Sequence, residues 1–177
     1  GSMVHRIKSY IPVIHESVFV AGTAEVAGRV TLDESASVWF SASVRGDIAP
    51  IQIGKNTNIQ DGAVVHCDED TPCVIGSGVT VGHCAVIHSA TIGDNTLVGM
   101  GAIILRGAVI GENCVVGAGS LVTSGKKFPP GSMIFGNPAK PVRKLTPEEI
   151  EKNRDIARKY TESARTAKND YQDAETV

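Results

Sequence analysis

The sequence is poor in aromatic residues, in net charge and in long apolar segments. Aromatic residues make up 5% of the 177 residues, which is less than the core of a β-sandwich would require. The formal net charge of −2 offers no basic patch, so we expect neither nucleic acid nor a membrane surface as a partner. No apolar run reaches the roughly 18 residues that could span a bilayer. These features indicate one domain without membrane segments.

Cysteine is scarce, and no charged segment followed by an apolar one resembles a secretory leader. The 4 cysteines are compatible with a reduced cytosolic protein. Gly1-Ser2-Met3 is typical of a cloning remnant placed before a native methionine. We therefore predict a cytoplasmic protein.

The sequence is rich in aliphatic residues that recur every six positions between Ile14 and Val122. The phase of this period slips three times, with extra residues after Val44 and Val65 and one residue too few after Ile87. A coiled β-solenoid explains such a period, because each short strand contributes one inward side chain and then turns a corner. The positions are Ile14, Val20, Val26, Leu32, Val38, Val44, Ile53, Ile59, Val65, Ile75, Val81, Ile87, Ile92, Val98, Ile104, Ile110, Val116 and Val122.

We predict an all-β solenoid over residues 14–125, with about six triangular coils stacked about 4.8 Å apart. Residues 1–13 would contain the cloning remnant and a leading strand near Ile7-Lys8-Ser9-Tyr10. The insertions near 49–51 and 68–72 would bulge out at corners, because the period resumes after each.

A capped helix is predicted beyond the solenoid. Thr146 is a good N-cap, and Glu149 completes a capping box three residues later. One helix cannot bury its apolar face alone, so it should pack along a side of the solenoid. The remaining segments would be an extended connector, the helix and a disordered tail, at residues 126–145, 146–168 and 169–177.

Two histidines occupy equivalent positions one coil apart. His66 follows Val65 and His88 follows Ile87, each the third inward residue of its coil. Their imidazoles should therefore stack about one strand spacing apart and could converge on one metal. A solvated surface position is the alternative for any single outward histidine, but a stacked pair favours ligands.

His83 stands two residues after Val81, near a different corner of the triangle. On a rigid prism it cannot easily reach the face that carries His66 and His88. A shared metal would then require His83 from another copy of the chain, and a threefold assembly would place up to three such sites at subunit boundaries. Zinc on three neutral imidazoles would keep a fourth position for water and bring its pKa near neutrality, while Fe2+ and Co2+ are other candidates.

Four polar residues accompany the histidines. Arg45 stands one coil before His66 in the same row, and with Asp47 it could form either a structural pair across subunits or part of the catalytic site. Gln60 and Asn58 lie on the coil of His66, where neutral side chains could orient a metal-bound hydroxide. Asn58 could instead be a turn residue.

These motifs resemble the γ-class carbonic anhydrase family over roughly residues 10 to 165. The resemblance is carried by the hexapeptide repeat, Arg45-Gly46-Asp47, the stretch from Asn58 to Gly62 that leads to His66, the His83-x4-His88 spacing, and Gly136-Asn137-Pro138-Ala139-Lys140. It implies a left-handed parallel β-helix in a homotrimer, with zinc held by His66 and His88 of one subunit and His83 of the next. The implied reaction is reversible hydration of carbon dioxide to bicarbonate by metal-bound hydroxide at the trimer interfaces.

The resemblance also assigns two further residues. Glu69, three residues after His66, stands where the family's proton shuttle would be, and Tyr160 resembles a tyrosine near the site in members with a short acidic loop. The chain departs from the archaeal prototype in its short Asp68-Glu69-Asp70 loop and in Ile48, which replaces a second glutamate.

Two other classes of function are compatible with the sequence. A hexapeptide acyltransferase would use a metal-free histidine as general base and a groove for coenzyme A. A metal-stabilised trimer, or a hydrolase of small esters with little hydratase activity, would keep the metal without the hydration reaction.

Overall fold

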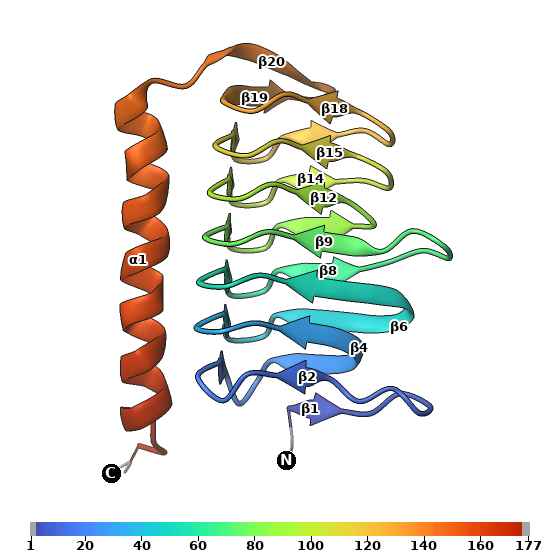
Figure 1. Ribbon diagram of the computed structural model, residues 1–177, viewed down its shortest axis with the longest axis vertical. Helices are drawn as coiled ribbons and strands as arrows, with labels where there is room; N and C mark the ends of the chain where they lie inside the picture. Colours follow the sequence, from blue (N-terminus) through green and yellow to red (C-terminus); the bar gives the residue numbers. More distant parts are fainter. Residues whose placement is uncertain (1–2, 175–177) are drawn as a thin grey trace.

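The computed structural model describes residues 3–174, which form a triangular parallel β-solenoid with one helix alongside it (Figure 1). The predicted fold class is confirmed: the solenoid is a left-handed β-helix, with about seven turns rather than six. Residues 1–2 of the expected cloning remnant and residues 175–177 of the expected tail lie outside the described residues.

The coils stack into three faces. The first face carries β1 (Val4–His5), β4 (Glu25–Leu32), β6 (Ser43–Ile53), β8 (Val64–His66), β11 (Val86–His88), β14 (Ile103–Ile104) and β17 (Leu121–Val122). The second face carries β2 (Val13–Ile14), the ends of β4 and β6, β9 (Cys73–Ile75), β12 (Thr91–Ile92), β15 (Val109–Ile110) and β18 (Lys127–Phe128). The third face carries β3 (Phe19–Val20), β5 (Ser37–Val38), β7 (Asn58–Ile59), β10 (Thr80–Val81), β13 (Leu97–Val98), β16 (Val115–Val116), β19 (Ser132–Gly136) and the antiparallel β20 (Ala139–Lys144).

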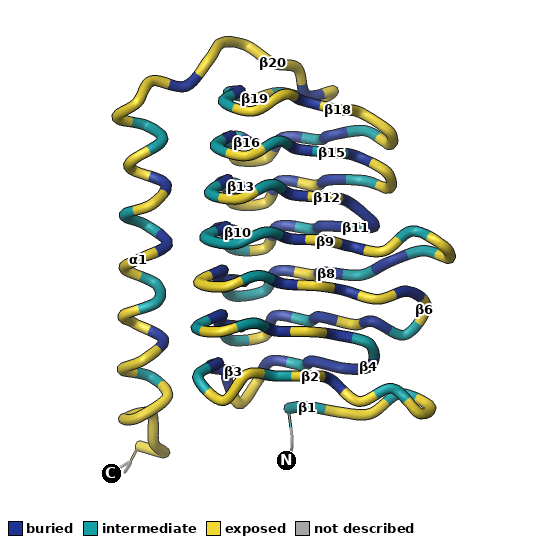
Figure 2. Tube along the Cα trace, viewed as in Figure 1, coloured by how far each residue is buried: buried dark blue, intermediate teal, exposed yellow. Residues whose placement is uncertain are grey.

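The aliphatic series forms the core. From Val26 to Val122 every member is at most 2% exposed, whereas Ile14 and Val20 in the first coil are partly buried (Figure 2). The period runs on past its expected end, because Phe128 pairs with Ile110 and Ile134 pairs with Val116. The boundary predicted at residue 125 was therefore wrong, and much of the expected connector belongs to the solenoid.

The first insertion forms a bulge within the continuous strand β6, as predicted. Gly46 pairs with Gly28 and Ile51 pairs with Val30, so residues 47–50 of β6 stand opposite Arg29 alone. A Cβ at Gly46 would stand 2.4 Å from the carbonyl oxygen of Arg29, so glycine permits this close approach. The second insertion does project, as the loop between β8 and β9 (Figure 1).

The leading strand was also placed wrongly. β1 at Val4–His5 pairs with β4, whereas Ile7 and Tyr10 exchange backbone hydrogen bonds across a tight turn. Lys8 supplies the left-handed backbone of that turn, with φ 55°. This turn reverses the chain before the first full coil begins.

The helix α1 (Pro147–Asp170) runs back along the third face toward the first coils (Figure 1). Its capping box forms as predicted, since Thr146 Oγ1 accepts from Glu149 N at 3.2 Å and Glu149 Oε1 accepts from Thr146 N at 3.0 Å. The buried amide of Asn153 ties the helix to the solenoid by donating to the carbonyl oxygens of Asn95 and Cys114. Within residues 3–174 no helix combines the length and apolarity needed to cross a bilayer.

The capping box of α1 predicts a contribution to the folding stability that is lost in acid. The hydrogen bonds from Arg143 and then from Thr146 lower the pKa of Glu149 to about 2 from 4.5. Because the folded pKa lies below the unfolded one, the stabilisation is present above pH 4.5 and is lost as pH falls toward 2. Thermal unfolding of Glu149→Gln should therefore differ from wild type at pH 6 and converge with it near pH 2. Glu148→Gln, at an exposed neighbouring position, should unfold at the same temperature as wild type both at pH 6 and near pH 2.

Candidate metal centre

Strand pairing stacks the two predicted histidines. His66 of β8 is the register partner of His88 of β11, and their ring centroids lie 5.3 Å apart on the first face. Both side chains are mostly buried, with 16% and 27% of their surface exposed. The predicted row is also formed, because Arg45 is the register partner of His66.

Each stacked imidazole contacts a carboxylate. His66 Nε2 lies 2.9 Å from Asp47 Oδ1, and His88 Nε2 lies 2.9 Å from Asp68 Oδ1. Arg45 in turn donates to Asp47 of its own chain. A carboxylate at one ring nitrogen fixes the ring and leaves the other nitrogen free to bind a ligand. We call His66, His88, Asp47 and Asp68 the first half-site.

The carboxylates of the first half-site are held in the ionised form. Burial opposes ionisation of Asp47, but hydrogen bonds from His66 and Arg45 outweigh it, and the pKa of Asp47 lies below its ordinary value. The hydrogen bond from His88 is the main cause that lowers the pKa of Asp68. The half-site therefore offers two imidazoles oriented by negative charge.

His83 lies elsewhere, at the corner that follows β10 of the third face. Its Nδ1 is 3.1 Å from Asp61 Oδ1, and the side chain is 42% exposed. The ring of Tyr160 on α1 packs edge-on against Trp39, which follows β5 of the third face, and burial and the charge of Asp61 raise the pKa of the Tyr160 hydroxyl. We call His83, Asp61, Gln60 and Tyr160 the second half-site.

Gln60 and His83 line one cavity of about 350 Å³ between the third face and α1. Gln60 Nε2 donates to Asn58 Oδ1 at 3.0 Å, and Asn58 Nδ2 donates to Thr80 Oγ1 at 3.1 Å. Both amides are almost fully buried, so Asn58 is not an exposed turn residue. Its role here is to hold the Gln60 side chain beside His83. The walls are otherwise mainly apolar, from Leu97, Val98, Met100, Val115 and Ile156.

The two half-sites are not joined within one chain. Among the described residues, no three histidine, cysteine, aspartate or glutamate side chains form a group that could hold a metal. Imidazole nitrogens are nevertheless the donors that zinc prefers. The stacked pair His66–His88 fits two ligands of such an ion and needs a third from elsewhere.

Relatives in other organisms identify the family. A carbonic anhydrase of Geobacillus kaustophilus is 44% identical over 160 residues, which cover 90% of this chain and 88% of that protein. The mitochondrial gamma carbonic anhydrase 2 of Arabidopsis thaliana is 42% identical over 145 residues, covering 78% of this chain and 52% of that protein. The chain belongs to the γ-class carbonic anhydrase family.

Two further similarities place this γ-class carbonic anhydrase relative among hexapeptide proteins. The family model of the bacterial transferase hexapeptide (six repeats) matches residues 89–124. The crystal structure of a hexapeptide transferase family protein from Anaplasma phagocytophilum superimposes with a TM-score of 0.89 at 38% identity, covering 92% of this chain and 96% of that one. The relatives are thus named after two different reactions, hydration of carbon dioxide and group transfer, and only the geometry of the site distinguishes them.

The structure adds residues that sequence reasoning missed. Asp68 rather than Glu69 contacts a histidine, and Glu69 lies at the exposed tip of the loop. Asp61 is the partner of His83, and Arg106 lies 3.8 Å from Asp68. Asp61 could have been found, because it stands in the register of His83 one coil earlier.

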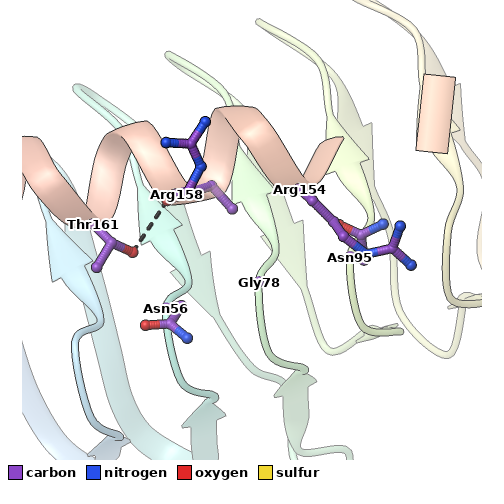
Figure 3. A pocket seen from close by; sticks show the side chains of 7 residues that line it. Asn56, Gly78, Asn95, Arg154, Arg158 and Thr161 are labelled. Atoms are coloured by element: carbon purple, nitrogen blue, oxygen red, sulfur yellow. Dashed lines mark hydrogen bonds between the residues drawn. The ribbon is translucent and has the colours of Figure 1, made fainter. Parts of the chain in front are cut away.

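A different hollow, of about 240 Å³, lies between α1 and the corners of the solenoid and contains Arg154 and Arg158 (Figure 3). Arg154 Nη1 is 2.9 Å from Glu151, and Arg158 lies 3.4 Å from both Asp155 and Glu162. These carboxylates on the same helix already compensate both guanidinium groups. The hollow therefore is a weaker candidate for an anion site than the half-sites are for a metal.

Proposed function

We propose that this chain assembles as a homotrimer, holds zinc between the two half-sites of neighbouring copies, and catalyses reversible hydration of carbon dioxide. The observation that carries the proposal is the stack of His66 on His88, with His83 on a different corner. The names of the family relatives support the reaction.

The proposed trimer is supported by the first face. Val64, Val86, Ile103 and Leu121 form one outward row of register partners beside the histidine pair. Val64 and Ile103, which flank Val86 in this row, are 39% and 38% exposed, and a contiguous exposed apolar surface is typical of an interaction site. Docking of this row on the third-face corner of another copy would bring His83 toward His66 and His88.

When bound by three imidazoles, zinc lowers the pKa of a coordinated water to about 7 and so supplies a nucleophile at neutral pH. The chain's own residues would orient the reactants. Asp47 and Asp68 hold the imidazole rings, and Asn58 fixes Gln60 so that its free amide oxygen can accept a hydrogen bond in the cavity. The apolar walls would exclude bulk water from the small apolar substrate.

Glu69 and Tyr160 keep proposed roles at the edge of the site. The exposed carboxylate of Glu69 could pass protons to solvent, because the loop that carries it begins beside His66. The Tyr160 hydroxyl stays protonated at neutral pH, since burial and Asp61 raise its pKa, and it can donate a hydrogen bond. A cytoplasmic location also remains our proposal.

Metal content and stopped-flow carbon dioxide hydration, measured on the same purified protein, test the proposal. We expect about one zinc per chain, a trimer by light scattering, and hydration that stops when a chelator removes the metal. Metal without hydration would favour the metal-stabilised trimer or the small-ester hydrolase. Absence of bound metal, or a monomer, would contradict the shared site.

Acyl transfer is the second candidate, because the matching family model and the Anaplasma phagocytophilum structure both carry transferase names. Calorimetric titration with acetyl-coenzyme A distinguishes the two. Binding by the zinc-free protein would favour the transferase, and the absence of binding would favour hydration.

A further inference from the structure

Each histidine of the first half-site belongs to a set of three residues, histidine, aspartate and arginine, and the sequence indicated only one of these two sets. In the first set, Arg45 donates to Asp47, which contacts His66. In the second set, Arg106 Nη1 lies 3.8 Å from Asp68 Oδ2, and Asp68 Oδ1 lies 2.9 Å from His88 Nε2. Each histidine of the stacked pair is therefore held by an aspartate that an arginine approaches.

Asp68 belongs to the short acidic loop, yet its backbone is fixed. The backbone N–H of Asp68 donates to Ser89 Oγ at 2.6 Å, and Ser89 is 1% exposed. Ser89 directly follows His88, and its own N–H donates to the carbonyl oxygen of His66 at 3.0 Å. Ser89, which holds the backbone of Asp68, is thus itself held by the backbone of His66 and joined to His88.

The next coil holds the loop from the other side. Arg106 Nη2 donates to the carbonyl oxygen of Glu69 at 3.3 Å, so the guanidinium contacts both the loop backbone and the Asp68 carboxylate. Half of the Arg106 side chain is exposed, which makes this contact weaker than the one from Ser89. Together the two residues hold an otherwise exposed loop against His88.

We propose that Asp68 is a positioning residue for His88, and that Ser89 and Arg106 hold Asp68 in place for this purpose. The inference rests on the proposed function in one respect, namely that His88 binds the metal. It assigns to the short loop a structural task at the metal centre, separate from proton transfer by Glu69.

The physical reason is general for histidine ligands. A carboxylate that accepts a hydrogen bond from one ring nitrogen fixes the tautomer and orientation of the imidazole and increases the basicity of the other nitrogen. Loss of such a group typically weakens metal binding by about 10–100-fold. Asn can still accept the ring N–H but lacks the charge, whereas Ala removes both.

The test compares zinc affinity, by competition with a chromogenic chelator, in wild type and variants. Asp68→Ala should weaken binding by about 10–100-fold and Asp68→Asn by less, with Ser89→Ala changing it in the same direction. Asp70→Asn is the matched control, because it removes the same charge from the same loop at an exposed residue. Its affinity should stay within about twofold of wild type.

The visible spectrum of the Co2+-loaded protein gives a second readout, which a purely structural role would leave unchanged. Asp68→Ala should alter its band positions and intensities, and Asp70→Asn should not. Thermal unfolding of the metal-free proteins identifies any variant that fails to fold, in which case Asp68→Asn alone decides. Wild type that binds no zinc would overturn the proposed function. Wild type that binds zinc, with Asp68→Ala or the folded Asp68→Asn indistinguishable from it in affinity and spectrum, would overturn this inference.

Discussion

His83→Ala should lose zinc as completely as His66→Ala does, although the two histidines stand at different corners of the solenoid. In the proposed assembly each metal takes His66 and His88 from one copy and His83 from another, so removal of either kind of ligand damages every site. We expect affinity to fall by at least about a hundredfold in both variants, because loss of a ligand costs more than loss of a supporting residue. Metal analysis after dialysis against a buffer of fixed free zinc concentration measures the zinc retained by each variant.

His15→Ala is the matched control. His15 is an exposed histidine whose Nδ1 contacts Ser17 Oγ at 2.8 Å, far from either half-site along the stack. This variant should keep its zinc. Retention of zinc by His83→Ala, with loss in His66→Ala, would show that the site is not built across subunits.

Co-expression of the two deficient chains gives a sharper version of the experiment. His83→Ala chains keep the first half-site, and His66→Ala chains keep His83. Mixed trimers would therefore rebuild a site wherever an intact first face meets an intact corner, which random assembly gives at about a quarter of the interfaces. Zinc binding should reappear in the mixture although neither variant binds it alone. A site contained in one chain would show no such recovery.

The six-residue period was sufficient to place the residues of the half-sites relative to one another. It put His66 in register with His88 and with Arg45, and it separated His83 from them, because every coil repeats the same inward positions. The partners of the histidines were not predictable in the same way. Asp68 contacts His88 from a loop outside the period, so its position depends on contacts with Ser89 and Arg106.

The two ends of the solenoid were harder to predict for a physical reason. Phe128 keeps the period but is aromatic, and it falls together with Pro129-Pro130 inside the connector predicted at residues 126–145. The structure places these prolines in a corner, where no ladder hydrogen bond is needed, and the next inward residue is Ile134. At the other end, Val4 pairs with Val26 before the period begins. The boundaries are therefore set by strand pairing that extends beyond the regular repeat.

Ile87→Ala should be among the most destabilising single substitutions in this chain. Ile87 is fully buried, and its register partners Val65 and Ile104 are fully buried on the coils to either side. The coils are stacked through β-ladders, so they cannot easily close around the missing side chain. The cost should be about 2–5 kcal/mol of unfolding free energy, from lost burial and the remaining cavity.

Ile103→Ala is the matched comparison, since it deletes the same atoms from an outward position that is 38% exposed on the same face. Urea unfolding of the metal-free proteins, compared at matched protein concentrations over a dilution series, measures both, because assembly contributes to the apparent stability. For the isolated chain Ile103→Ala should cost less than about 1 kcal/mol. A large effect of Ile103→Ala that disappears on dilution would place the outward row in an interface between copies. Equal and small effects of both substitutions at all concentrations would contradict the assignment of Ile87 to a rigid core.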